Sequence, residues 1–412
     1  MTTLTEQKEI LPPPSERSTP LGWVLKNLFN NWFNSLLTII SLAVVYVVLR
    51  GTIHWAFTTA RWQVVPANLR LFLVGQYPSQ IPGEPDEVWR IWLVLYLLAA
   101  TVGLSWGVWV KHKEMVAWVL TGLPIAIALI PFSLKVRALL VGLSVAGIIF
   151  WWIGKRWGAH LGKLTTTLWI LYFPLAIFIV NGFGPEYDPA NPGLLPVIPT
   201  RFWGGLLLSL ILAVVGIVFS FPFGVILALG RQSELPIMRT LSIVYIEMVR
   251  GVPFISLLFM GQVMLPLFLP QGINPDRVIR AIVATIMFAS AYLAENVRGG
   301  LQAIPKGQHE AAYALGLNGF QTMLFIILPQ ALRTVIPVLV GQFIGLFKDT
   351  SLVAIVGLLD LLGIARSVIA NPKFIGTQRE VFLFISLFYF VLSYGLSYAS
   401  RRLESALGVG ER

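Results

Sequence analysis

Apolar segments of membrane-spanning length recur along this chain, and they constrain its fold more than any other feature. A helix needs about 20 apolar residues to cross roughly 30 Å of hydrocarbon, and about ten segments approach that length. Hydrophobic residues make up 56% of the 412 residues and charged residues only 12%, so most side chains must face lipid or other apolar helices. The sequence therefore predicts an all-α, polytopic membrane protein.

Short polar stretches separate the predicted spans. The spans run from Trp32 to Leu49, Ile91 to Val110, Met115 to Pro131, Ala138 to Ile153, Leu164 to Val180, Gly205 to Leu229, Phe254 to Leu269, Val278 to Leu293, Val335 to Leu361 and Val381 to Ala399. An even number of crossings returns the carboxyl terminus to the side of the amino terminus. That side holds more Lys and Arg than the other, which predicts that both termini are cytoplasmic.

The remaining composition excludes several function classes. The formal net charge is +11, but Lys and Arg form no dense basic block. Their distribution therefore indicates the orientation of the spans in the membrane and predicts no nucleic-acid partner. Cysteine is absent and the four histidines are scattered, which predicts no protein-bound metal. The first 20 residues are polar and contain four prolines, Pro12, Pro13, Pro14 and Pro20, which indicates a tail rather than a signal peptide.

A proline-rich loop near residue 200 divides the predicted spans into two blocks. The division predicts a tail at 1–21, an amino-terminal extension of about five spans at 22–200, a core of about five spans at 201–403 and a second tail at 404–412. No internal duplication relates the two blocks, so the sequence does not support the fold of an inverted-repeat transporter. Lipid is the expected surrounding of both.

The segment from Glu295 to Arg333 is too polar to be immersed, although it lies between two spans. Residues 308–315 are rich in helix-forming residues and follow the helix breakers Pro305 and Gly307, and Gly316 offers a helix stop. A short helix at the membrane surface is the expected result, with Glu310 available to an Arg or Lys of a partner. An ordinary amphipathic connector would show the same composition.

Specific motifs in this segment favour the partner-binding interpretation. Three features resemble the cytoplasmic loop of ATP-binding cassette (ABC) import permeases: Glu310-Ala311-Ala312, Gly316 and Ile326-x-Leu328-Pro329. The flanking motifs are similar to those of the polar amino acid branch, of histidine-permease type: Tyr292-Leu293-Ala294-Glu295, Arg298-Gly299-Gly300, Pro305-Lys306-Gly307-Gln308, Leu328-Pro329-Gln330-Ala331 and Lys348-Asp349-Thr350-Ser351-Leu352. The layout of the amino-terminal extension resembles the longer permeases for general L-amino acids and for glutamate, glutamine and aspartate.

The resemblance implies a type I ABC importer permease core in the carboxyl-terminal half, with 296–333 as the coupling loop. Such a subunit lies in the bacterial inner membrane and moves polar amino acids by alternating access. It pairs with a second permease, here expected as a heterodimer, and receives cargo from a periplasmic amino acid-binding protein. A pair of ATPase subunits drives it, and those subunits bind the ATP and magnesium.

The sequence contains no phosphate-binding loop of its own. The nearest approach, from Gly158 to Lys163, has too few residues between its glycines and places Leu164 where a hydroxyl is needed. The chain is therefore expected to catalyse translocation and no bond chemistry, with no cofactor of its own. A multi-span enzyme is disfavoured because no clustered His, Asp and Glu set is found.

Lys348 and Asp349 lie near the middle of the predicted span from Val335 to Leu361. A charge at the centre of a bilayer costs about 2.5–3.5 kcal/mol on insertion scales, so both need polar compensation. With the hydroxyls of Thr350 and Ser351 they are candidates for the substrate path, where Asp349 would meet an ammonium and Lys348 a carboxylate. An internal ion pair is the structural alternative. A stand-alone ion-coupled transporter or channel, with these two residues as its coupling site, is the competing functional class.

Glu295 and Arg298 stand one helical turn apart at the end of a predicted span. We expect them to pair at the membrane interface, and a role in gating is the less favoured alternative. Arg250, Gly251 and Pro253 likewise indicate an interfacial arginine followed by a helix start.

Overall fold

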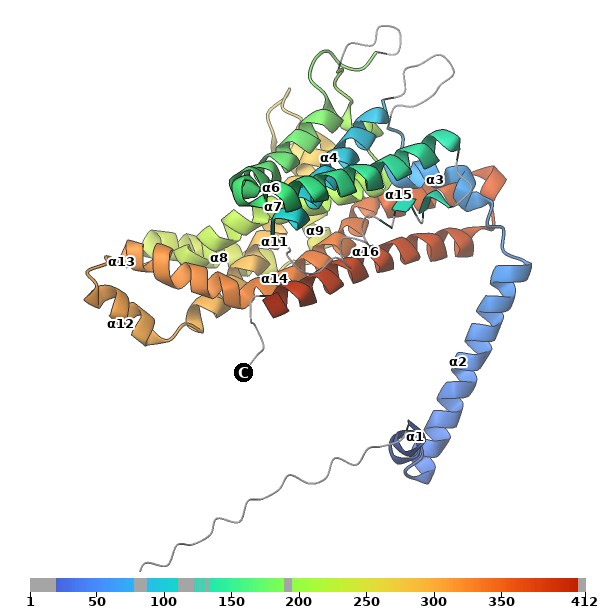
Figure 1. Ribbon diagram of the computed structural model, residues 1–412, viewed down its shortest axis with the longest axis horizontal. Helices are drawn as coiled ribbons and strands as arrows, with labels where there is room; N and C mark the ends of the chain where they lie inside the picture. Colours follow the sequence, from blue (N-terminus) through green and yellow to red (C-terminus); the bar gives the residue numbers. More distant parts are fainter. Residues whose placement is uncertain are drawn as a thin grey trace, which may run out of the picture. The chain divides into compact units, whose positions relative to one another are not determined.

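The structure, a computed structural model, describes residues 20–77, 87–109, 133–188 and 195–406, together with a few positions between 122 and 129. Within these residues every named element is an α-, 3₁₀- or π-helix (Figure 1). Extended backbone pairs there only at isolated bridges, Glu186 with Val197 and Gly205 with Asp360. The predicted all-α fold class is confirmed.

The chain forms two compact units. Unit 1 ends at Trp62 and contains α1 (Pro20–Leu28) and α2 (Trp32–Thr58). Unit 2 begins at Gln63. Its elements in chain order are α3 (Val64–Val74), α4 (Trp89–Trp109), α6 (Leu134–Asn181), η1 (Thr200–Phe202), α7 (Gly205–Arg231), α8 (Pro236–Arg250), α9 (Phe254–Phe259), η2 (Met260–Met264), α10 (Leu265–Phe268), α11 (Arg277–Gln302), α12 (Lys306–Ala314), α13 (Gly319–Gln321), η3 (Thr322–Ile327), α14 (Leu328–Asp349), η4 (Thr350–Val356), α15 (Leu361–Ala370), η5 (Pro372–Phe374) and α16 (Gln378–Ala406).

The described residues contain eight helices that are long and apolar enough to cross a membrane, or up to nine if one bent pair counts as a span. Their positions agree with most of the predicted spans. The third predicted span, Met115 to Pro131, lies mostly outside the described residues. The fourth and fifth fall within α6, where they are separated by a break in the helical dihedrals at Trp157 rather than by a loop.

Two predicted spans have a different shape in the structure. The segment from Phe254 to Leu269 is interrupted by the π-helix η2, and it forms the bent pair with α8 at an angle of 103°. The segment from Val335 to Leu361 is not one helix either. Its α-helical part ends at Asp349, a 3₁₀-helix follows, and Gly357 at φ +82° turns the chain toward α15. A hydropathy pattern reports burial in lipid but cannot detect such breaks.

The longer helix of unit 1, α2, has no buried residues within the described chain. Exposed apolar side chains are distributed around all of its faces. The Asn31 side chain caps its start by accepting a hydrogen bond from the Asn34 amide at 2.8 Å. A helix that is apolar all round is stable in lipid or against other membrane helices.

The core of unit 2 forms around α11, which packs against α7, α8 and α14. It is the most buried of the candidate spans, with 56% of its most apolar stretch inside the protein. One end of unit 2 carries α12 and α13, and the opposite end carries α3 and α15 (Figure 1). A chain of hydrogen bonds joins α11 to α14 within the bundle: the Asn296 amide donates to Gln342 at 2.7 Å, and Gln342 donates to the Ala289 carbonyl at 2.9 Å.

Contacts in unit 2 cross the domain boundary predicted near residue 200. Val64 and Phe72 of α3 share a buried cluster with Leu361 of α15 and Val381 of α16. The helix that follows unit 1 is therefore part of the same packed body as the carboxyl-terminal spans.

Glycines allow α4 and α6 to approach closely. A Cβ atom on Gly103 would lie 2.3 Å from the Gly147 carbonyl oxygen, and one on Gly107 would lie 2.3 Å from that of Trp151. Small residues at such positions are a common basis for packing between membrane helices, because lipid provides no hydrophobic drive for association.

We expect Gly107→Leu to separate α4 from α6 and to destabilise the protein by about 1–3 kcal/mol, the usual range for overpacking. The thermal unfolding midpoint in detergent measures this effect. Gly162→Leu on α6 is the matched control, because nothing lies within 4 Å of its Cβ position. Equal midpoints for the two variants would contradict the close contact.

Candidate functional site

The predicted surface helix is present as α12, and its two ends are defined by local geometry. Pro305 precedes it, and the helix begins at Lys306, two residues before the predicted start at 308. At the other end Gly316 has φ +79°. Its amide donates to the Tyr313 carbonyl at 2.9 Å, and the Leu317 amide donates to that of Ala312 at 3.2 Å. These two bonds form a Schellman motif, which favours glycine at this position.

The chain after α12 returns directly to a long helix. Asn318 and Gln321 form a capping box that starts α13, and the π-helix η3 then leads into α14, which begins with Leu328 and Pro329. Leu328 is buried in the cluster around α11. The Gln330 side chain donates to Gln308 at 3.1 Å, which links α14 to α12. The predicted motif residues of the coupling loop therefore lie on α12, on its terminal turn, in η3 (Ile326) or at the start of α14.

The outer surface of this loop combines a carboxylate with exposed apolar side chains. Glu310, Ala311 and Gly316 are exposed, whereas Ala312 is 3% exposed and faces inward. Three large apolar side chains are also exposed on the same loop: Tyr313 at 55%, Leu315 at 81% and Phe320 at 74%. Exposed apolar groups next to a charge are typical of a protein-binding surface. Sequence reasoning singled out Glu310 but not these three side chains.

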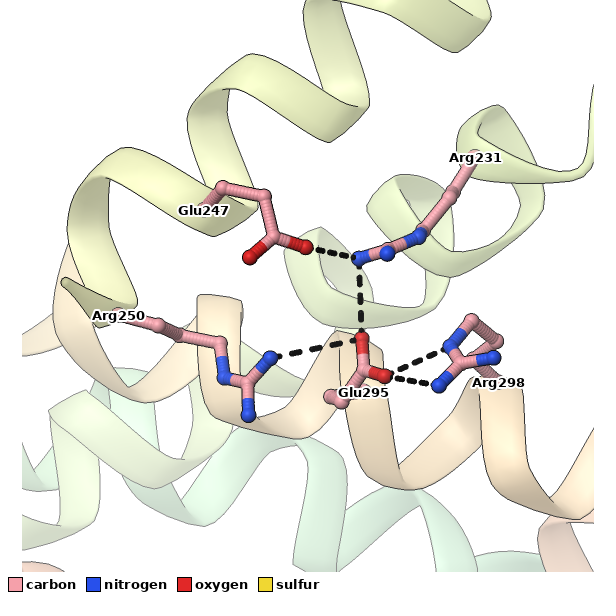
Figure 2. Close-up of polar contacts among 5 residues, drawn as sticks. All are labelled: Arg231, Glu247, Arg250, Glu295 and Arg298. Carbon is pink, nitrogen blue, oxygen red and sulfur yellow. Dashed lines mark hydrogen bonds and ion pairs between the residues drawn. The ribbon is translucent and has the colours of Figure 1, made fainter.

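A cluster of charged side chains connects the last residues of α7 and α8 to the final two turns of α11. Figure 2 shows its members, which we call the Glu295 cluster: Arg231, Glu247, Arg250, Glu295 and Arg298. Arg298 donates to Oε1 of Glu295 through Nε at 2.7 Å and also through Nη2. Arg231 donates to Oε2 of Glu295 at 3.1 Å and lies 2.9 Å from Glu247. Arg250 approaches the same Oε2 at 3.7 Å.

The sequence indicated only part of this cluster. The spacing of Glu295 and Arg298 predicted a local pair, but Arg231 and Glu247 were not singled out. Arg231 is the last residue of α7 and Arg250 the last residue of α8. The sequence does show basic residues at the ends of apolar helices. That these residues share Glu295 as a partner depends on how the three helices pack, which the sequence does not show.

The candidate substrate-path residues lie at the end of α14 that is remote from the coupling loop, and they are Lys348, Asp349, Thr350 and Ser351. Because α14 has 22 residues, it separates the two predicted sites by about 33 Å. Lys348 is exposed and Asp349 is partly buried, and within the described chain no ion pair involves either of them. The Thr350 hydroxyl donates to the Phe347 carbonyl at 2.7 Å.

No set of three or more His, Cys, Asp and Glu side chains in the described part of the chain could hold a metal ion.

Comparison with known proteins gives full-length matches. Residues 220–408 match the family model described as "Binding-protein-dependent transport system inner membrane component". The chain is 36% identical to the inner membrane amino-acid ABC transporter permease protein YhdY of Escherichia coli K12, over 97% of this chain and 96% of that protein. It is 35% identical to the glutamate/glutamine/aspartate/asparagine transport system permease protein BztC of Rhodobacter capsulatus, over 98% of this chain and 97% of that protein.

A shorter relative matches the carboxyl-terminal half. The probable glutamine ABC transporter permease protein GlnP of Bacillus subtilis is 39% identical over 49% of this chain and 91% of that protein. The full-length matches confirm the resemblance inferred from the motifs around Glu310. The chain belongs to the amino-acid ABC transporter permease family.

Proposed function

We propose that this chain is the permease subunit of an ATP-driven importer that moves polar amino acids across the bacterial inner membrane by alternating access. The observation that supports this most is the similarity to YhdY and BztC over nearly the whole length of all three chains. YhdY is named as an ABC transporter permease protein and BztC as a transport system permease protein, which favours this function over a stand-alone ion-coupled transporter.

The partners follow from the same proposal. A pair of ATPase subunits binds the ATP and magnesium and docks on the coupling loop at 296–333. A periplasmic amino acid-binding protein delivers cargo at the opposite face, and a second, non-identical permease completes the pathway. Both termini then lie in the cytoplasm with the coupling loop, and lipid surrounds the spans. The chain itself is a transport subunit without an ATPase site.

Helix α12 is suited to act as the attachment point of the ATPase. Its Schellman motif fixes the end of the helix, and the Gln308–Gln330 bond ties it to α14. The exposed Glu310 offers a carboxylate to a basic partner residue, and Tyr313 and Leu315 offer apolar contact area. Movement of α12 would reach the spans through α11 on one side and α14 on the other, since both flank the loop.

The substrate path is proposed at the far end of α14. There Lys348, Asp349, Thr350 and Ser351 place a cation, an anion and two hydroxyls at the change from α-helix to 3₁₀-helix. A zwitterionic amino acid needs both signs of charge. The absence of an ion pair between Lys348 and Asp349 in the described chain leaves both groups available for a ligand.

The division near residue 200 is proposed to separate a permease core from an added amino-terminal block. The match to GlnP indicates that about half of the chain corresponds to a nearly complete short permease, which supports a core at 201–403 and an added block at 22–200. The packing of α3 against α15 and α16 joins that block to the core.

We expect Glu310→Lys to weaken binding of the ATPase by at least about tenfold, because like charges brought together at an interface cost several kcal/mol. Co-purification and substrate-stimulated ATP hydrolysis of the reconstituted complex measure the effect, while membrane insertion should be normal. Glu234→Lys is the matched control, as another exposed carboxylate at the α7–α8 turn. Unchanged uptake in Glu310→Lys would contradict the docking role.

The Schellman motif predicts opposite effects for two alanine substitutions on α12. Gly316→Ala forces a side chain into the left-handed region, which costs about 1–2 kcal/mol and should speed hydrogen exchange of the α12 amides roughly five- to thirtyfold. Gly307→Ala lies inside the helix, where alanine is favoured by about 1 kcal/mol, and should slow exchange. Equal exchange in both variants would contradict the assigned helix end.

For the substrate path, we expect Asp349→Asn to lower amino acid uptake by roughly tenfold or more, since a hydrogen bond to a charged group contributes about 1.5–3 kcal/mol. Complex assembly and basal ATP hydrolysis should be unchanged, because Asn has nearly the same size. Wild-type uptake kinetics would assign Asp349 a structural role instead.

A further inference from the structure

We propose that Glu295 is a positioning residue that makes the ends of α7, α8 and α11 move as one body with α12. This inference rests on the proposed function, because it assigns a route for the force that the ATPase applies. It goes beyond the local pair of Glu295 and Arg298. The observation that carries it is that one carboxylate is shared by arginines from three helices (Figure 2).

The two oxygens of Glu295 have different partners. Oε1 accepts both hydrogen bonds from Arg298, which is one turn away on the same helix. Oε2 faces Arg231 of α7 and Arg250 of α8. A single side chain on α11 therefore binds the ends of two other helices, and Arg250 is further held by the ring of Tyr292, 5.5 Å from its centroid.

The cluster is shielded enough for these contacts to matter. The Glu295 side chain is 19% exposed and the three arginines between 23% and 34%. By contrast, Arg201 and Glu186 at the other end of α7 form a pair that is 69% and 63% exposed. Exposed pairs of that kind contribute little, whereas removal of one partner from a shielded network leaves uncompensated charge.

The balance of charge makes Glu295 the critical member. Three arginines face two carboxylates, and Glu247 contacts only Arg231. Without the Glu295 charge, Arg250 and Arg298 would have no carboxylate partner among the ion pairs of this cluster, and three guanidinium groups would repel one another. The three helices would then be held together at this point only by their apolar contacts, which do not fix the positions of the charged ends.

The location of Glu295 connects this cluster to the coupling loop. It lies two turns before the end of α11 at Gln302, and α12 begins at Lys306. The apolar contacts below the cluster involve the same helices, with Ala228 of α7 and Ile246 of α8 packed against Leu293 and Val297 of α11. Displacement of α12 is thus transmitted through α11 to α7 and α8, provided that the ionic contacts hold their ends together.

The test uses the complete reconstituted transporter, with its ATPase, binding protein and second permease, in proteoliposomes. We measure amino acid uptake per ATP hydrolysed for wild type and for Glu295→Gln. The expected result is a fall in this ratio of about tenfold, within the range of coupling between linked sites, with assembly retained. Glu186→Gln, which removes the exposed pair, is the matched control and should keep the wild-type ratio.

A charge exchange separates the proposal from a local pair. The double variant Glu295→Arg with Arg298→Glu restores an i,i+3 pair on α11 but places an arginine opposite Arg231 and Arg250. We expect it to remain uncoupled. Recovery of the wild-type ratio would overturn the shared-carboxylate role, as would a wild-type ratio in Glu295→Gln.

If Glu295→Gln does not assemble, Glu295→Asp decides the question. It keeps the charge but is one methylene shorter, so it should assemble and lower the ratio because it cannot reach all three arginines; an unchanged ratio would overturn the proposal. Failure of the proposed function is distinguishable, because in that case the wild-type transporter itself would show no ATP-dependent uptake.

Discussion

The hydrocarbon interior of a bilayer admits a polypeptide backbone only when its amide and carbonyl groups are paired within the protein. This requirement makes every candidate span in the described chain helical and favours charged side chains near helix ends. Charges that remain at those ends can hold several helices together, as Glu295 does with Arg231, Arg250 and Arg298. In the proposed function, the ATPase acts on the spans through the polar loop that contains α12.

The sequence was sufficient to predict the class of fold and the main candidate site. Long apolar segments specify membrane helices with little ambiguity, because a charge within the bilayer is costly. The helix at α12 was predictable for a local reason: Pro305 and Gly316 lie at its ends, and their backbone preferences act without tertiary contacts. The prediction of its first residue differed by two positions, since Gly307 is tolerated inside the first turn.

Features that depend on tertiary packing were not predictable. The end of α14 at Asp349 and the π-helix η2 lie inside predicted spans, because hydropathy does not report the type of helix. The helix start predicted after Arg250 is present at Phe254, but the 103° angle between α8 and the following helix depends on packing. The partners of Glu295 required three helices to be placed relative to one another. The packing of α3 with α15 and α16 likewise joins residues far apart in the sequence. The proline-rich loop near residue 200 therefore predicted a boundary along the chain, but it could not show the contacts that cross this boundary.

The central claim is that α12 is a cytoplasmic attachment point for a separate ATPase. The chain has no cysteine, so a single cysteine at Leu315, which is 81% exposed, can be labelled selectively. A membrane-impermeant thiol reagent should label it in inverted vesicles but not in right-side-out vesicles, and addition of the ATPase should protect it. Labelling from the outer side, or equal labelling with and without the ATPase, would contradict the account.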